Sequence, residues 1–232
     1  MKSFPHDFIS NVHMHGLNPR SREIFLHGHF DTDNEEPGVD YRMASTFIKN
    51  IILLNRQNTT SPIYIHMNSI GGEWNDGMAI YDAIVASVAP VCIIAYAHAR
   101  SMTSIIFQAA DLRLMSPSAD FMIHYGSFSI DDTTLGTLSA AEWMNYSNKV
   151  MLDVYANRCK DGEYFKRYKK YNEDPDAIKS FLDRKMKDKQ EWYLTSKEAV
   201  EYGFADGVLG REFSLDDILK NNIEIEKTEW KI

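Results

Sequence analysis

The chain of 232 residues is poor in the features that mark secreted, membrane and nucleic-acid-binding proteins. Its two cysteines, Cys92 and Cys159, are too few for a disulfide framework and favour a reducing compartment such as the cytoplasm. No apolar run reaches about 18 residues, the length that a membrane span needs, and the N-terminus lacks the apolar core of a signal peptide. The net charge of −8 argues against a nucleic-acid-binding surface. We therefore expect a globular protein with neither a membrane nor a nucleic-acid partner.

Apolar residues make up 44% of the chain and charged residues 25%, the ordinary balance of a globular protein. Short apolar segments alternate with segments of helical periodicity, a pattern that indicates a layered α/β fold with parallel strands. We expect strands at 22–27, 63–67, 91–96, 112–115, 120–124 and 205–209. Helices are expected from residue 41 up to the Ser61-Pro62 stop, around 80–88, at 101–110, at 138–159 and from the capping box at 195–198 to Gly203.

This pattern predicts one domain over residues 23–210. An N-terminal arm or loop at 1–22 precedes it, and a tail at 211–232 follows, whose last twelve residues are polar and expected to be loosely held. Charges of both signs are dense over 158–191, so we expect a solvated helical projection there rather than a core. The aromatic stripe of Trp143, Tyr146 and Tyr155 is expected to pack.

Ser101 is the first candidate for chemistry, because it follows an apolar strand across a short turn and opens a helix. Its hydroxyl can face a cleft while free N–H groups of the first helical turn point the same way. A serine nucleophile also needs a base, an orienting acid and donors for an oxyanion. Capping is the commoner role of a serine at a helix start, so the position by itself leaves both interpretations open.

Two further segments could complete such a site. His124 ends a short strand and is a candidate base, although a structural histidine at a strand end would give the same pattern. Gly71-Gly72 lies between a strand and a helix, where glycine lets bare backbone approach a ligand. The spacing disfavours a phosphate loop, which leaves an oxyanion site, a peptide-backbone site or an ordinary turn. His98 is a rival base, but it lies too near Ser101 in sequence to face its hydroxyl comfortably.

The remaining histidines offer a weak metal signal. His13-Met-His15 and His27-Gly-His29 both have the His-x-His spacing of strand-borne metal ligands. No third ligand cluster accompanies them, so we expect no metal site.

Four blocks occur in an order that resembles the ClpP family, the proteolytic subunit of Clp proteases. They are Ile63-Tyr-Ile-His-Met-Asn-Ser-Ile-Gly-Gly72 followed by Gly77-Met-Ala-Ile-Tyr-Asp82, then Ala99-Arg-Ser-Met102, then Phe121-Met-Ile-His124, and finally Tyr193-Leu-Thr-Ser-Lys-Glu-Ala-Val-Glu-Tyr-Gly203. The resemblance covers roughly residues 22–210. It implies the ClpP/crotonase-like fold, a layered sheet with flanking helices, with a projecting helical handle at about 130–190.

The resemblance also implies roles for individual residues. Ser101 would be the nucleophile and His124 the general base, with the backbone N–H groups of Gly72 and Met102 as the oxyanion hole. Glu191 stands two residues before the last block, where the family has an aspartate. A glutamate can also orient a histidine, although its side chain is one methylene longer. Asp188, one helical turn earlier, is the alternative third member.

The chain departs from the family pattern at several places. Ile70 replaces a proline, and Thr103 replaces a glycine after the Ser-Met pair. Residues 127–132 stand where the family has a glycine-rich strand that lines the substrate groove and helps two rings meet. The N-terminal arm also lacks the family's axial-loop sequence.

The function implied is that of an ATP-dependent Clp-type serine endopeptidase subunit, cytoplasmic and free of metal or organic cofactors. It would form a heptameric ring, single or stacked as a tetradecamer, that encloses unfolded protein or peptide substrates, while an AAA+ unfoldase uses the ATP. The alternatives are an inactive structural ring subunit, a ClpP-like phage maturation protease, and another crotonase-like protein that handles acyl-CoA without a serine nucleophile.

Overall fold

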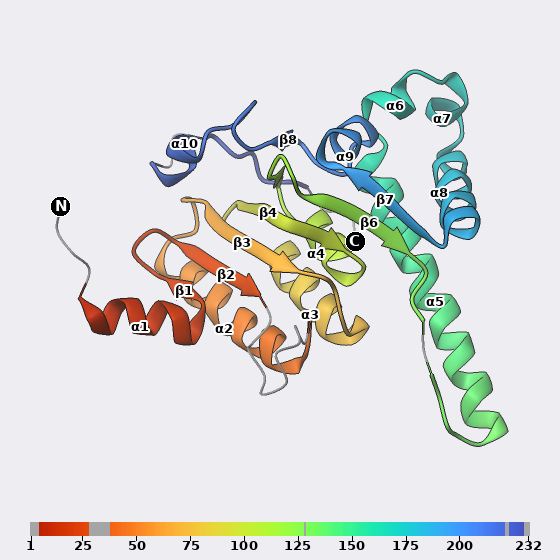
Figure 1. Ribbon diagram of the computed structural model, residues 1–232, viewed down its shortest axis with the longest axis horizontal. Coiled ribbons are helices and arrows are strands. Elements are labelled where there is room, and N and C mark those ends of the chain that lie inside the picture. Colours follow the sequence, from red (N-terminus) through yellow and green to blue (C-terminus); the bar gives the residue numbers. More distant parts are fainter. Residues whose placement is uncertain (1–4, 28–37, 128, 221–222, 230–232) are drawn as a thin grey trace.

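The computed structural model describes residues 5–27, 38–127, 129–220 and 223–229, and these form one α/β unit (Figure 1). Its eight-stranded sheet has the order β1-β2-β3-β4-β5-β8, with β6 paired to β4 and β7 paired to β6. The pairs are parallel except β1–β2 and β6–β7. The strands are β1 Leu17–Asn18, β2 Glu23–His27, β3 Ile63–Ser69, β4 Val91–Arg100, β5 Leu112–Met115, β6 Asp120–His124, β7 Glu191–Thr195 and β8 Gly207–Val208. The layered α/β prediction is confirmed.

Helices α2, α4 and α9 begin within about one residue of the expected positions, whereas α3 and α5 begin six and four residues earlier than expected. Asp40 caps α2 through the N–H of Met43 at 2.8 Å, and Thr195 with Glu198 forms the capping box of α9. The helices are α1 His6–His15, α2 Tyr41–Gln57, α3 Trp74–Val85, α4 Met102–Gln108, α5 Thr134–Cys159, α6 Glu163–Lys166, α7 Lys169–Glu173, α8 Pro175–Lys189, α9 Ser196–Tyr202 and α10 Leu215–Leu219. The loop interpretation of residues 1–22 is wrong over residues 6–15, which form α1.

The sheet buries both of its faces at its centre, because consecutive side chains at 63–65 of β3 and 91–95 of β4 are buried. Ile63 and Ile65 of β3 belong to the main core, which they share with α2, α3 and α4. Tyr64 faces the opposite side and joins a second cluster with Cys92, Ile94, Leu114 and Ile218, against which Ile223 and Ile225 pack.

This second cluster corrects the prediction of a loosely held tail. Residues 223–229 run back across the sheet, where Lys227 Nζ lies 3.1 Å from a carboxylate oxygen of Asp111. The N–H of Thr228 donates to the same carboxylate at 2.7 Å. Ile223 and Ile225 alternate with polar residues in this segment, a strand-like pattern that the overall polarity of the tail conceals.

Strand β4 is the element that positions the site, because it changes partners along its length. Its first half pairs with β5, from Cys92 to Ala95, and its last residues pair with β6, from His98 to Arg100. The turn predicted at 97–100 is therefore part of the strand. The chain leaves this strand directly into Ser101 and α4, beside the end of β6.

The handle consists of the first half of α5, which projects beyond the rest of the molecule (Figure 1). Helices α6, α7 and α8 fold back beside its second half, and Phe165, Tyr171 and Phe181 are buried there among other aromatic rings. The prediction of a solvated surface at 158–191 is therefore wrong for this inner side. Apolar residues spaced between the charges pack there and continue the main hydrophobic core.

Candidate active site

Ser101 occupies a strained backbone position at the start of α4. Its φ of 49° and ψ of −126° lie in a region that residues other than glycine rarely adopt, at a cost of about 1–3 kcal/mol. Three hydrogen bonds hold the turn. The N–H of Ser101 donates to the carbonyl of Met122 on β6 at 3.0 Å, and its carbonyl accepts the N–H and the hydroxyl of Ser104 at 3.0 and 2.6 Å. No side-chain capping bond is made by Ser101, so its hydroxyl stays available to other groups.

The structure brings Ser101 and His124 together. The Nε2 atom of His124 lies 2.8 Å from Oγ of Ser101, although 23 residues separate them in sequence. Because the N–H of Ser101 bonds to β6 two residues before His124, the strand pairing itself sets this distance. The pair has the geometry of a nucleophile and its general base.

The glycine loop after β3 packs against the Ser101 turn. A Cβ atom added to Gly71, whose φ is +115°, would lie 2.7 Å from the Cβ of Ser101. The carbonyl of Gly71 accepts the N–H of Val39 at 2.6 Å, which holds the loop from its other side. Gly72 and Met102 both line the cleft into which Ser101 opens, and Met102 is the first residue of α4, where N–H groups lack intrahelical partners.

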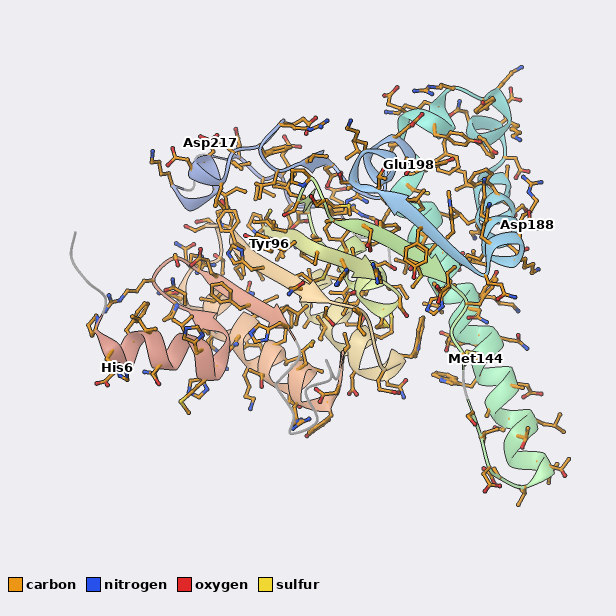
Figure 2. All side chains as sticks on the ribbon, viewed as in Figure 1. His6, Tyr96, Met144, Asp188, Glu198 and Asp217 are labelled. Carbon is orange, nitrogen blue, oxygen red and sulfur yellow. The ribbon has the colours of Figure 1, made fainter. Side chains whose placement is uncertain are left out.

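The cleft around Ser101 has a volume of about 340 Å³. Besides Ser101, His124, Gly72 and Met102, it is lined mainly by large apolar side chains from α3, α4 and α5, which are Trp74, Ile105, Trp143, Met144 and Met151. Met144 lies where α5 begins to leave the body of the molecule (Figure 2). The stripe of Trp143 and Tyr146, predicted to pack, is instead 56% exposed at each residue, and only Tyr155 is buried.

Glu191 lies directly opposite His124 in the antiparallel pairing of β6 and β7. Opposite residues of such a pair share one face of the sheet, with Cβ atoms about 4.5–5.5 Å apart. The carboxylate of Glu191 accepts the hydroxyl of Tyr193 at 3.0 Å in this structure. Asp188, the alternative acid, is an exposed residue of α8 (Figure 2). The register thus places Glu191, and not Asp188, next to the histidine along the sheet.

The electrostatics of the site favour a neutral imidazole. Burial lowers the pKa of His124 below its usual value, and the negative charge of Glu191 opposes this by raising it. Arg100 lies 5.3 Å from the ring centre of Tyr193, and the hydrogen bond and negative charge of Asp120 and, to a lesser extent, the charge of Glu191 raise the pKa of Arg100. Arg100 is itself held by Asp120, at 2.6 Å through its Nε.

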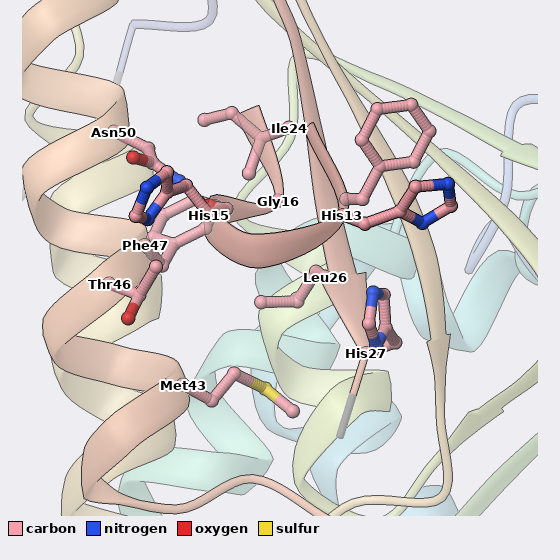
Figure 3. A pocket seen from close by; sticks show the side chains of 11 residues that line it. His13, His15, Gly16, Ile24, Leu26, His27, Met43, Thr46, Phe47 and Asn50 are labelled. Atoms are coloured by element: carbon pink, nitrogen blue, oxygen red, sulfur yellow. The ribbon is translucent and has the colours of Figure 1, made fainter. Parts of the chain in front are cut away.

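The other candidate residues do not converge on Ser101. His98 lies with its Nδ1 3.9 Å from the carboxylate of Asp120. His13, His15 and His27 line a separate small pocket between α1, β2 and α2 (Figure 3). Asn50 donates there to the backbone carbonyl of His15 at 2.8 Å. The residues that the structure describes contain no group of three or more His, Cys, Asp or Glu arranged to hold a metal ion, and His29 lies outside them.

Comparison with known proteins gives the class to which this fold and site belong. The family model for Clp protease matches residues 20–212 of the chain. A curated relative, the ATP-dependent Clp protease proteolytic subunit of Deinococcus radiodurans, is 28% identical over 173 residues, which cover 74% of this chain and 76% of the relative. The chain belongs to the Clp protease family, a family of serine-type peptidases whose members form oligomeric rings and work with Clp ATPases.

Several residues at the site do not stand out in the sequence. Tyr193, which holds Glu191, appears there only as the first residue of a matching block. Trp74 lies before the helix expected around 80–88 and Met151 lies within the helix expected at 138–159, and both line the cleft. Their roles depend on which face of each helix packs against the Ser101 turn. The spacing of apolar residues along one helix does not specify which other element packs against that face. Within the described residues, no helix combines the length and apolar character that crossing a bilayer requires.

Proposed function

We propose that this chain is a catalytically competent peptidase subunit that cleaves peptide bonds with Ser101 as nucleophile and His124 as general base. The observation that carries the proposal is the 2.8 Å contact between His124 Nε2 and Ser101 Oγ in the cleft. The strained turn and the neighbouring N–H groups at the start of α4 support the same interpretation.

The chemistry follows from these positions. His124, kept neutral by burial, takes the proton of Ser101 as its oxygen attacks the amide carbonyl. The N–H groups of Gly72 and Met102 then stabilise the oxyanion, and His124 returns the proton to the leaving amine. Water hydrolyses the acyl-enzyme by the same route. No metal or organic cofactor is needed in this sequence of steps.

Glu191 is the proposed third member. Its place opposite His124 in the strand register supports this role over Asp188. In this structure its carboxylate accepts the hydroxyl of Tyr193 at 3.0 Å, so the proposed role requires it to bond Nδ1 of His124 instead. The negative charge would then hold the tautomer that leaves Nε2 free to accept a proton.

We further propose that the chain works as a cytoplasmic ring, of seven subunits or of fourteen in two stacked rings. Unfolded protein or peptide substrates would enter the chamber, and an ATP-driven unfoldase would deliver them. The exposed apolar half of α5 supports an assembly, because a monomer would leave it in water. Two free, buried cysteines are consistent with a reducing compartment.

Labelling with a fluorophosphonate probe tests the nucleophile. The wild-type chain should be labelled on Ser101, while Ser101→Ala should lose both labelling and peptidase activity and keep its assembly, since this hydroxyl contributes little to packing. His124→Ala should lower peptidase activity by a similar factor, because the effects of removing residues that act as one catalytic unit are not additive. An unlabelled, inactive wild-type assembly would favour the alternative of a structural ring subunit.

A further inference from the structure

Thr103 is a fully buried residue of α4, two positions after the proposed nucleophile, and its hydroxyl lies among backbone groups. The Oγ1 atom is 2.8 Å from the carbonyl oxygen of Ser69 and 2.7 Å from that of Arg100. It also accepts the N–H of Arg100 at 3.2 Å. One side chain therefore bridges the end of β3 and the end of β4.

The irregular pairing of β3 with β4 explains why a side chain is needed here. Met67 pairs with Ala95 but Ser69 pairs with Ala99, so β4 gains two residues over β3 between these points. Such a bulge interrupts the ladder of backbone hydrogen bonds. Ser69 is fully buried, and a buried carbonyl without a partner is destabilising. The Thr103 hydroxyl supplies a donor at this point, with its single hydrogen shared between the carbonyls of Ser69 and Arg100.

The two segments that Thr103 bridges carry the two proposed oxyanion donors. Ser69 leads into the loop of Gly71 and Gly72, and Arg100 leads into Ser101 and Met102. The close contact of Gly71 with Ser101 shows that the loop and the turn pack directly on each other. The distance between the N–H groups of Gly72 and Met102 therefore depends on this bridge.

We propose that Thr103 is a positioning residue that fixes the Gly72 and Met102 N–H groups at the spacing an oxyanion requires. The proposal rests on the proposed function, because it assumes that Ser101 attacks a carbonyl whose oxygen enters this space. Thr103 touches no substrate atom. It acts through the backbone of the two loops, and its hydroxyl, rather than its methyl group, carries the effect.

Peptide hydrolysis by Thr103→Val and Thr103→Ser tests the proposal. Valine keeps the shape and removes the hydroxyl, whereas serine keeps the hydroxyl and removes the methyl group. We expect kcat of Thr103→Val to fall by about tenfold or more with KM within about twofold, since a displaced donor weakens only the transition state. Thr103→Ser should stay within about threefold of wild type in both constants.

Ser196→Ala is the matched control, because Ser196 is buried and donates its hydroxyl to the carbonyl of Pro117 at 3.0 Å, away from the cleft. Ser196→Ala should lose about as much thermal stability as Thr103→Val and keep the kcat of the wild type. A Thr103→Val enzyme with near-normal kcat would overturn the proposal. The proposal would also be overturned if Ser196→Ala and Thr103→Val lost the same stability and the same kcat.

Should Thr103→Val not fold, Thr103→Ala replaces it and is compared with Thr103→Ser, from which it differs by the hydroxyl alone. Equal kcat values for these two would equally overturn the proposal. Failure of the proposed function is distinguishable, because the wild-type chain would then fail to react with a fluorophosphonate at Ser101, whatever stands at position 103.

Discussion

At the scale of single residues, the acid beside His124 decides how well the imidazole is oriented. Both acids are exposed, but Glu191 lies opposite His124 in the strand pair and bonds to Tyr193, whereas Asp188 lies on α8. The negative charge of Glu191 also acts to raise the pKa of His124, against the larger lowering by burial. The last sequence block ranks Glu191 above Asp188, and the strand register supports the same order.

We predict that Glu191→Gln lowers kcat/KM by about 10²–10⁴-fold, as loss of the orienting acid does in serine peptidases. Asp188→Asn, the matched control, should stay within about twofold, because an exposed helix carboxylate away from the imidazole contributes little. Steady-state hydrolysis of a fluorogenic peptide measures both. If Asp188→Asn were impaired and Glu191→Gln were nearly normal, Asp188 would be the orienting acid. If both variants were nearly normal, the enzyme would work with Ser101 and His124 alone.

The pH dependence of the reaction gives a second prediction at this scale. A general base must be neutral, so kcat/KM should fall with decreasing pH as His124 gains its proton. Because burial lowers the pKa of His124, this acidic limb should lie below about 6.5, the usual histidine value. Removing the Glu191 charge should lower the pKa of His124 further and shift the limb to more acidic pH. A limb above the usual value would contradict this electrostatic account.

At the scale of secondary-structure elements, the site is an arrangement of strand ends and one helix start. The end of β3 supplies the glycine loop, the end of β4 with the start of α4 supplies Ser101, and the end of β6 supplies His124. Parallel strands bring these ends to one edge of the sheet, where open α/β sheets commonly bind ligands. The close approach of the loops leaves no room for a side chain at Gly71.

We predict that Gly71→Ala lowers both stability and kcat/KM. Alanine at a φ of +115° is strained, and its Cβ would press on Ser101. The free energy of unfolding should fall by about 1–3 kcal/mol, measured by urea denaturation. Gly210→Ala is the control, since Gly210 also has a positive φ, of +80°, but open space around it in the described part of the chain. It should lose stability through backbone strain alone and retain full activity.

At the scale of the whole molecule, the first half of α5 projects away from the body and carries exposed apolar side chains. Leu135 is 79% exposed and Leu138 57% exposed, on the same helix as the stacked rings of Trp143 and Tyr146. This exposed apolar surface supports the proposed assembly, because a monomer would leave it in water. The same helix lines the cleft with its middle turns, so assembly and the shape of the cleft are connected through one element.

We predict that light scattering finds an assembly of seven or fourteen subunits and that Leu138→Asp shifts it to smaller species. A carboxylate buried in an apolar contact is destabilising, and Leu138 does not line the cleft. Tyr41→Asp is the control, because Tyr41 is an exposed aromatic residue at the start of α2 and should leave the assembly unchanged. A wild-type monomer at micromolar concentration would contradict the ring.

Local patterns in the sequence determine most of the elements and point to the pair of reacting residues. The strands at 112–115 and 120–124 have the predicted bounds, and the capping box at Thr195 opens α9 as expected. Ser101, His124 and Gly72 stand out in the sequence alone, because their positions at strand and helix ends are local properties. The family assignment, which rests on the order of four blocks, is confirmed.

The tertiary structure decided what depends on contacts between distant segments. Only the switch of β4 from β5 to β6 places Ser101 beside His124. The β6–β7 register adds that Glu191, which the last sequence block already ranks above Asp188, lies opposite the histidine. The aromatic core within 158–191 and the packing of residues 223–229 on the sheet escape the sequence patterns for the same reason. A sequence pattern specifies which face of an element is apolar, but the partner that covers that face is chosen by the packing of the whole chain.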